Sequence, residues 1–184
     1  MAAGLDAAYD CHPDILTSRM PDLPQLSRSL LAYTMWADTQ HLDALAGIPA
    51  EHLTVATGTS FGSLLGTMAH VLGSEQVWIA RFVGAPLERF PEVTDWADFA
   101  AVRAGFEELW PGMEFFIAGL TAAQLETELA WISRGGNSYR RPLWEALVHM
   151  SHHSGYHRGQ LTTMLRQLGH PAPSTDLIGW FASH

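Results

Sequence analysis

The sequence has little of what would take it outside the ordinary globular class. Its 184 residues include one cysteine, Cys11, so no internal disulfide can form, which fits a reducing compartment. No apolar run approaches the roughly 18 residues of a membrane span, and the chain does not open with a basic and then apolar leader. These absences predict a cytoplasmic protein with no membrane partner. With 47% hydrophobic and only 16% charged residues, the chain should fold, and its length fits one domain.

Basic side chains are also scarce. Lys and Arg together number 10 against 19 Asp and Glu, which gives a formal net charge of -9 at pH 7. This charge repels phosphate backbones, and the longest basic run is Arg140-Arg141, so we expect no nucleic-acid partner. Histidine, in contrast, is plentiful: the chain has 10, and four of them lie between His149 and His157. That cluster needs an explanation.

Glycine and proline divide the chain into helical segments. We expect an N-terminal arm, residues 1–22, and one domain, residues 23–184. Its long helices are predicted from Leu23 to Ala46, from Ser60 to Val83, from Thr94 onward with a kink or split at Pro111, and from Pro142 to a stop at Gly169. A short terminal helix is expected over 176–181, and the alternating segment 128–140 could form a small hairpin. Helices with short connections predict an all-α, antiparallel four-helix bundle.

The last long helix carries His149, His153 and His157 at a spacing of four, on the flank of its apolar stripe. Residues four apart lie about 6 Å from each other along the axis, so His153 and His157 can aim at one point. His149 lies about 12 Å from His157, too far for two nitrogen–metal bonds of about 2 Å each. A third ligand must come from another helix. Spacing alone leaves open that the pair are ordinary surface or core histidines.

His70, in the segment 60–83, lies off the apolar stripe of its helix. Its neighbours at helical spacing are small, and we expect them to leave open space around a metal ion; they are Ser63, Gly66, Thr67 and Ser74. Geometry alone does not identify His70 as a ligand, because it could equally face solvent. Three neutral imidazoles without a fourth protein ligand are typical of catalytic metal sites, in which a position stays free for water or substrate.

Two segments resemble the DinB-like (DinB/YfiT) family. The segment 60–78 around His70 is similar to that family's second helix, and His153 followed by His157-Arg-Gly-Gln160 resembles its signature. The resemblance covers about residues 26–168, and Trp36 lies where such proteins often have tryptophan. It implies a four-helix bundle whose three metal ligands are His70, His153 and His157. His152 departs from the asparagine frequent at its position in the family.

Four further residues are candidates for lining or supporting this site. Gln160 lies three residues after His157 on the same face, so it could bond a metal-bound water or orient an imidazole. His149 could line the mouth of the site, and Trp36 and Trp78 could wall it. Each also has a plainer interpretation, as a polar surface residue or as part of the core.

The resemblance implies a divalent-metal protein, and three imidazoles suit zinc and nickel alike. Because relatives in the wider fold use low-molecular-weight thiols such as bacillithiol or mycothiol, the implied activity is a metal-dependent small-thiol S-transferase. A metal-dependent hydrolase is the alternative enzyme. It is less favoured because Glu75 projects onto the apolar stripe, which leaves no clear carboxylate base beside the histidines. The alternative outside enzymes is a non-catalytic, stress-responsive protein that binds a metal or small molecule.

The helix 23–46 has apolar residues on two sides. They are Leu26, Leu30, Tyr33 and Ala37 on one side and Leu31, Met35, Leu42 and Leu45 on the other. A lone bundle buries one face, so the second is covered by the N-terminal arm or by another subunit. Dimers are common in the family that the chain resembles, and we therefore expect a homodimer.

Overall fold

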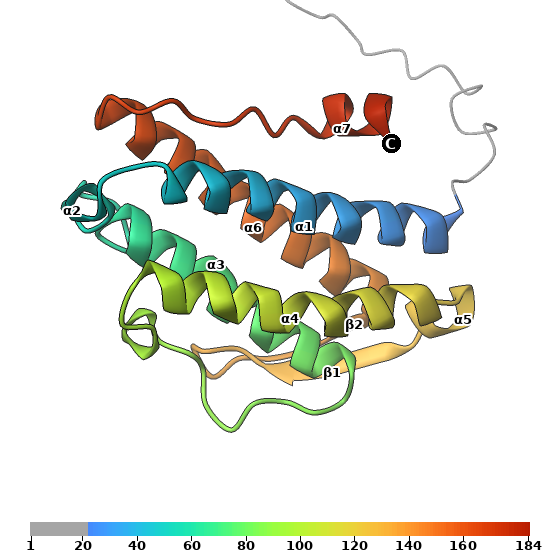
Figure 1. Ribbon diagram of the computed structural model, residues 1–184. Helices are drawn as coiled ribbons and strands as arrows, with labels where there is room; N and C mark the ends of the chain where they lie inside the picture. Colours follow the sequence, from blue (N-terminus) through green and yellow to red (C-terminus); the bar gives the residue numbers. More distant parts are fainter. Residues whose placement is uncertain (1–21) are drawn as a thin grey trace, which may run out of the picture.

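Helices predominate in the computed structural model, which describes residues 22–184 (Figure 1). The long helices are α1 (Leu23–Ala46), α3 (Leu64–Phe82), α4 (Phe99–Gly119) and α6 (Leu143–Gln167). The shorter elements are α2 (Ala50–Leu53), the 3-10 turn η2 (Val93–Asp95), α5 (Ala122–Leu125), α7 (Leu177–Ser183) and the strands β1 (Glu128–Ile132) and β2 (Ser138–Pro142). Apart from Asp22, the expected N-terminal arm, including Cys11, lies outside the described residues.

Capping side chains decide where two of the long helices begin. The Ser63 hydroxyl accepts a hydrogen bond from the amide of Gly66, and this cap places the start of α3 at Leu64 rather than at Ser60. Asp98 caps α4 in the same way, so the predicted start near Thr94 is wrong, and residues 93–95 form η2 instead. Pro111 lies inside α4 without dividing it. The predicted bounds of α1 are confirmed at both ends.

The long helices contact one another in a closed ring, α1 with α6, α6 with α3, α3 with α4, and α4 with α1. In Figure 1, α1 and α6 run from right to left, whereas α3 and α4 run from left to right. Neighbours are therefore antiparallel only in the pairs α1/α4 and α3/α6. The expected wholly antiparallel order is corrected because the long segment 83–98 carries the chain back along α3 before α4 begins.

The apolar stripes predicted for the long helices lie inside this ring. Five residues of the stripe in α6 are buried, namely Leu143, Leu147, Met150, Leu161 and Leu165. They pack in two clusters, one with Leu64 and Met68 of α3 and the other with Trp78. Burial of these faces positions α3 and α6 side by side, which is what brings their histidines together.

The chain itself covers both sides of α1. Leu31, Leu42 and Leu45 are fully buried in the core. On the other side, the Tyr33 hydroxyl donates to the carbonyl of Thr175 at 2.6 Å, and its ring meets Trp180 of α7 at a centroid distance of 6.1 Å. The two apolar sides of α1 therefore no longer argue for a second subunit.

A two-stranded sheet is the one departure from helix among the described elements. β1 and β2 pair antiparallel from Glu128↔Pro142 to Ile132↔Ser138, where the sequence predicted a hairpin. Gly136 in its turn has φ +82°, a conformation that favours glycine. The hairpin lies against α3, and Arg81 of α3 donates a hydrogen bond to the Ile132 carbonyl at 2.9 Å. The fold is mostly helical rather than all-α.

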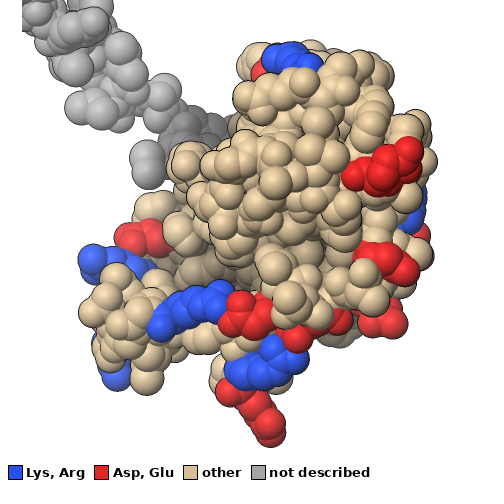
Figure 2. Space-filling model, turned by 90° about the vertical axis from the view of Figure 1, so that its left-hand side faces the viewer, with Lys and Arg blue, Asp and Glu red and all other residues tan. Residues whose placement is uncertain are grey.

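The surface is mixed in charge. Figure 2 shows acidic and basic side chains interspersed over the lower part of one end of the molecule, with no broad basic area on that face. Among residues 22–184 no helix combines the length and apolarity needed to cross a bilayer. The absence of a nucleic-acid partner stays a prediction.

Candidate metal centre

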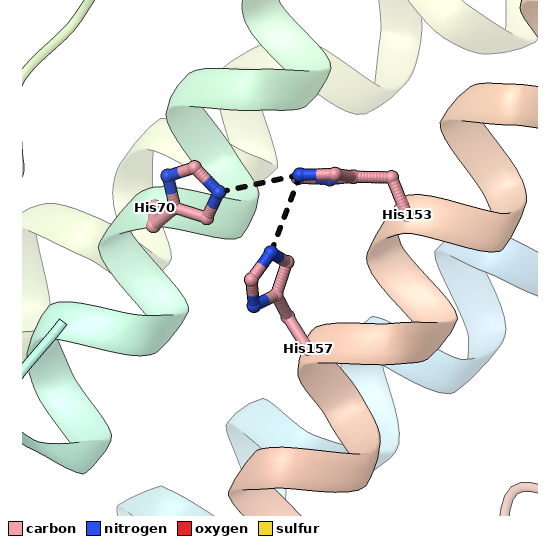
Figure 3. Close-up of side chains that lie close together, drawn as sticks. All are labelled: His70, His153 and His157. Carbon is pink, nitrogen blue, oxygen red and sulfur yellow. Dashed lines mark hydrogen bonds between the residues drawn. The ribbon is translucent and has the colours of Figure 1, made fainter. Parts of the chain in front are cut away.

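Three histidine side chains converge between α3 and α6 (Figure 3). Nε2 of His153 lies 3.4 Å from Nε2 of His70 and 3.2 Å from Nε2 of His157. One ring nitrogen of each histidine lies within 4.8 Å of the other two. A tetrahedral zinc ion with bonds of about 2.0–2.1 Å holds its ligand nitrogens about 3.3–3.4 Å apart. The spacing therefore fits three ligands of one ion.

Two hydrogen bonds orient the rings. His157 Nδ1 donates to Oε1 of Gln160 at 2.8 Å, and because a carbonyl oxygen only accepts, Nε2 of His157 keeps its lone pair toward the centre. Ser74 Oγ lies 3.3 Å from Nδ1 of His153 on the far side of that ring. Lone pairs that point at one another repel, whereas a cation between them is attracted to each. The donor set therefore suits a cation.

Aromatic rings enclose the cluster on two sides. Phe61, in the turn before α3, stacks on His70 at a centroid distance of 3.7 Å and an interplanar angle of 13°. The ring of Tyr156 lies nearly perpendicular to that of His157, at a centroid distance of 5.1 Å. The helix expected from Ser60 would have included Phe61. Because the cap at Ser63 delays the start of α3 to Leu64, Phe61 lies in the preceding turn, where its ring covers the imidazole of His70.

The expected open space along the His70 face is not formed by the small residues themselves. A Cβ at Gly66 would lie 2.2 Å from the carbonyl oxygen of Phe61, so this glycine permits a close backbone approach. Ser63 caps α3, and Thr67 is buried with its hydroxyl bonded to the Ser63 carbonyl. Of the four small residues, Ser74 contacts the cluster, through His153.

Burial and mutual repulsion keep the three imidazoles neutral. Burial, then the charges of His157, His153 and Arg134, lower the pKa of His70 to about 3. Burial and the neighbouring histidines lower the pKa of His153 to about 4. Burial also lowers the pKa of His157, against the Gln160 contact, which raises it. Neutral imidazole is the form that binds a metal, so the cluster is ready to bind at pH 7.

We expect His70 and His153 of the metal-free protein to stay neutral between pH 7 and pH 5. The unfolded chain binds protons at these histidines below about pH 6.5. The folded chain does not, so they lower the stability as the pH falls from there toward their folded pKa values of about 3 and 4. Histidine Cε1–H resonances, assigned with His70→Gln and His153→Gln, should not shift over this range. A midpoint near 6.5 for either histidine would contradict the prediction.

The other predicted site residues differ in how close they lie to the histidine cluster. Gln160 contacts His157 directly. The ring of His149 lies 6.0 Å from that of His153 and meets the edge of buried Trp78 at 5.2 Å, so both border the cluster on one side. Trp36 does not reach the cluster. Its ring lies 6.1 Å from Tyr33 and 6.4 Å from His184, because that side of α1 faces the C-terminal segment rather than α3.

Behind the cluster lies a buried polar network that the sequence did not reveal. Arg158 Nη1 donates to Asp38 at 2.8 Å, with side-chain exposures of 2% and 0%. Ser154 donates to Glu75 at 2.6 Å. Burial, then the charge of Asp38, raises the pKa of Glu75 well above its usual value. The only signal for this network in the sequence was that Asp38 and Arg158, which have opposite charges and lie on different helices, are each turned toward the apolar stripe of their helix.

None of the three histidines lines any of the main cavities among the described residues. One of these cavities, with a volume of about 640 Å³, lies between α3, the segment 84–90 and β1. His70 and His153 are half-buried, so they can be approached from the surface.

The fold and the site together define a mostly helical protein with a three-histidine cluster between two core helices. The model of the DinB family matches residues 20–182, so the chain belongs to the DinB family, and the resemblance read from its two motifs is confirmed.

Two known proteins illustrate the relationship. Protein DinB of Bacillus subtilis (strain 168) is 28% identical over 154 residues, which cover 80% of this chain and 88% of that protein. The crystal structure of a DinB-like protein from Bacillus cereus ATCC 10987 matches with a TM-score of 0.56 at 20% identity, over 79% of this chain and 94% of that chain. At this identity the second match shows a shared fold.

Proposed function

We propose that the protein binds one divalent first-row metal ion through His70, His153 and His157. The observation that carries the proposal is the convergence of the three imidazoles: Nε2 of His153 lies 3.4 Å from that of His70 and 3.2 Å from that of His157, close to the edge of a tetrahedral coordination shell, and one nitrogen of each ring lies within 4.8 Å of the others. Lowered pKa values and the Gln160 contact support it, because they keep the imidazoles neutral and one of them oriented. Zinc and nickel are the ions that such a donor set suits best.

The proposal extends to chemistry, as a metal-dependent S-transferase for a small thiol. Three protein ligands leave the fourth tetrahedral position of the ion free. A thiol that binds the ion at this position has a lowered pKa, because the cation stabilises the thiolate. The placement of Glu75 favours a thiol over water as the nucleophile. Its carboxyl group is fully buried and accepts a hydrogen bond from Ser154 rather than from any of the three histidines, and burial and the charge of Asp38 raise its pKa, so it is not placed as a base at the cluster. A thiolate needs no such base.

Titration of the cobalt-substituted protein with several low-molecular-weight thiols tests this activity. We expect at least one thiol to produce thiolate-to-cobalt charge-transfer absorption, and His70→Ala to abolish it. If no thiol perturbs the spectrum while esters or amides are hydrolysed in a metal-dependent way, the hydrolase is correct instead. Metal binding without either result would indicate the non-catalytic, stress-responsive binding protein.

Assembly and location complete the proposal. We interpret the closed ring of long helices as a four-helix bundle and propose a homodimer in the cytoplasm. Because the chain covers both sides of α1, the subunits would have to meet through other apolar residues, such as the exposed Phe115 of α4 or Ile178 of α7, whose exposures are 85% and 79%.

A further inference from the structure

A second, polar cavity lies on the side of α6 that faces away from the histidine cluster. Its volume is about 470 Å³, and it lies between α6, Tyr33 of α1 and the segment 172–177 that leads to α7. At about 100° per residue, Gly155, Gly159 and Thr162 of its lining project opposite to His153 and His157. The cavity is therefore separate from the candidate metal centre.

The guanidinium of Arg158 is the unusual feature of this cavity. Arg158 lines it and is 98% buried, since its side chain has an exposure of 2%. Nη1 is paired with Asp38, but Nε and Nη2 have no hydrogen-bond partner among the described residues. Buried donors without partners are unfavourable, so a ligand that accepts from both nitrogens is favoured.

The surroundings leave room for such a ligand. A Cβ at Gly155 would lie 3.6 Å from Arg158 Nη2, so Gly155 lies directly beside that nitrogen, of which less than 1 Å² is accessible. A Cβ at Gly159 would meet nothing within 4 Å. Arg166, two turns beyond Arg158 on α6, brings a second guanidinium to the lining. The acidic residue of the lining, Asp176, belongs to the opposite wall.

We propose that this cavity binds a small oxyanion, the phosphate or carboxylate group of a small molecule, through Nε and Nη2 of Arg158 and the guanidinium of Arg166. Two parallel N–H groups on one edge of a guanidinium match two oxygens of either anion. Because less than 1 Å² of either nitrogen is accessible, the anion has to displace part of the cavity wall to reach that edge, and Gly155 is the residue of α6 that lies beside it. Tyr33, which also lines the cavity, has its ring centroid 5.3 Å from the Arg158 guanidinium.

Calorimetric titration of the full-length protein with inorganic phosphate and, separately, with acetate tests the site. We expect saturable binding of at least one anion, and the anion that binds identifies the group. Arg166→Gln removes a charge, and Gly155→Ala places a methyl group against Nη2 at an ordinary contact distance. Each should weaken binding by at least about tenfold. Arg158 itself is left unchanged, because its replacement would break the buried pair with Asp38.

Matched controls separate the site from general effects. Arg141→Gln removes an exposed arginine outside the cavity, and Gly112→Ala adds a methyl group to α4 where it meets nothing within 4 Å. Both should bind the anion like the wild type, with equal metal content and unchanged circular dichroism in all variants. Two results would overturn the proposal: no saturable binding of either anion, or wild-type affinity in both Arg166→Gln and Gly155→Ala.

Discussion

Replacing His153 or His157 with alanine is expected to reduce metal loading from about one ion per chain to almost none. Each imidazole supplies one of three converging nitrogens, and two remaining nitrogens cannot hold a divalent ion against a competing chelator. The affinity should fall by more than the roughly 10–100-fold typical of losing an outer contact. Elemental analysis after loading and desalting, together with chelator competition, measures both quantities.

His149→Ala is the matched control, because it removes the same side chain from the same helix, one turn before His153. It should retain the ion, since its ring lies 6.0 Å from that of His153 and borders the cluster without joining it. The metal affinity of Gln160→Ala should lie between that of His149→Ala and that of the two ligand variants. We expect about 10–100-fold weaker binding than in the wild type, because His157 loses the acceptor that orients it. Wild-type loading in both His153→Ala and His157→Ala would refute the proposed ligand set.

Asp38→Ala is expected to destabilise the metal-free protein by about 3–5 kcal/mol, which is the largest stability effect we expect from one substitution of a charged residue. The reason is that the guanidinium of Arg158, with an exposure of 2%, would remain buried without the carboxylate that pairs with it. Urea unfolding followed by circular dichroism measures the change. The effect should appear as a lower midpoint with an unchanged slope.

Asp43→Ala provides the comparison on the same helix. Asp43 pairs with Arg103 at 2.6 Å, but these side chains are 57% and 35% exposed, so the loss should be only about 0–1 kcal/mol. Replacing Asp38 and Arg158 together with apolar residues should recover much of the stability lost in Asp38→Ala, because no charge is then left unpaired. Equal losses in Asp38→Ala and Asp43→Ala would show that the buried pair has no special role.

Residues of the buried network and of the histidine cluster lie on adjacent faces of one helix, α6, because consecutive residues are turned by about 100°. Ser154 follows His153, and Arg158 follows His157, so α6 presents metal-binding candidates to α3 and polar anchors to the interior. The anchors bond to Asp38 of α1 and Glu75 of α3. Such bonds set the rotation of α6 between its neighbours, and this rotation aims the two imidazoles at His70.

Local patterns were sufficient to predict the long helices and the hairpin, but not where α3 and α4 begin. The bounds of α1, the hairpin between β1 and β2, and the terminal helix near 176–181 follow from glycine, proline and the period of the apolar residues. The relative directions of the helices did not follow. They depend on the path of the segment 83–98, whose composition does not show whether the chain crosses the molecule before the next helix begins.

The site was predictable in the same uneven way. The spacing of His153 and His157 predicted that they aim at one point, because a helix fixes the relation between residues four apart. His70 could be proposed only through the family motif, since no local rule relates residues 83 positions apart in the chain. Trp36 was proposed because it lies where members of the family often have tryptophan, yet its side of α1 faces the C-terminal segment.

The sequence by itself determined the helices, the pair of histidines in α6 and the family, because each depends on residues within a few turns of one another. Only the tertiary structure decided that Phe61 covers His70, that Asp38 meets Arg158, and that this arginine, with two donors unpartnered among the described residues, lines a second cavity. These contacts join different helices. Their geometry is set by how the buried faces pack, which no single segment encodes.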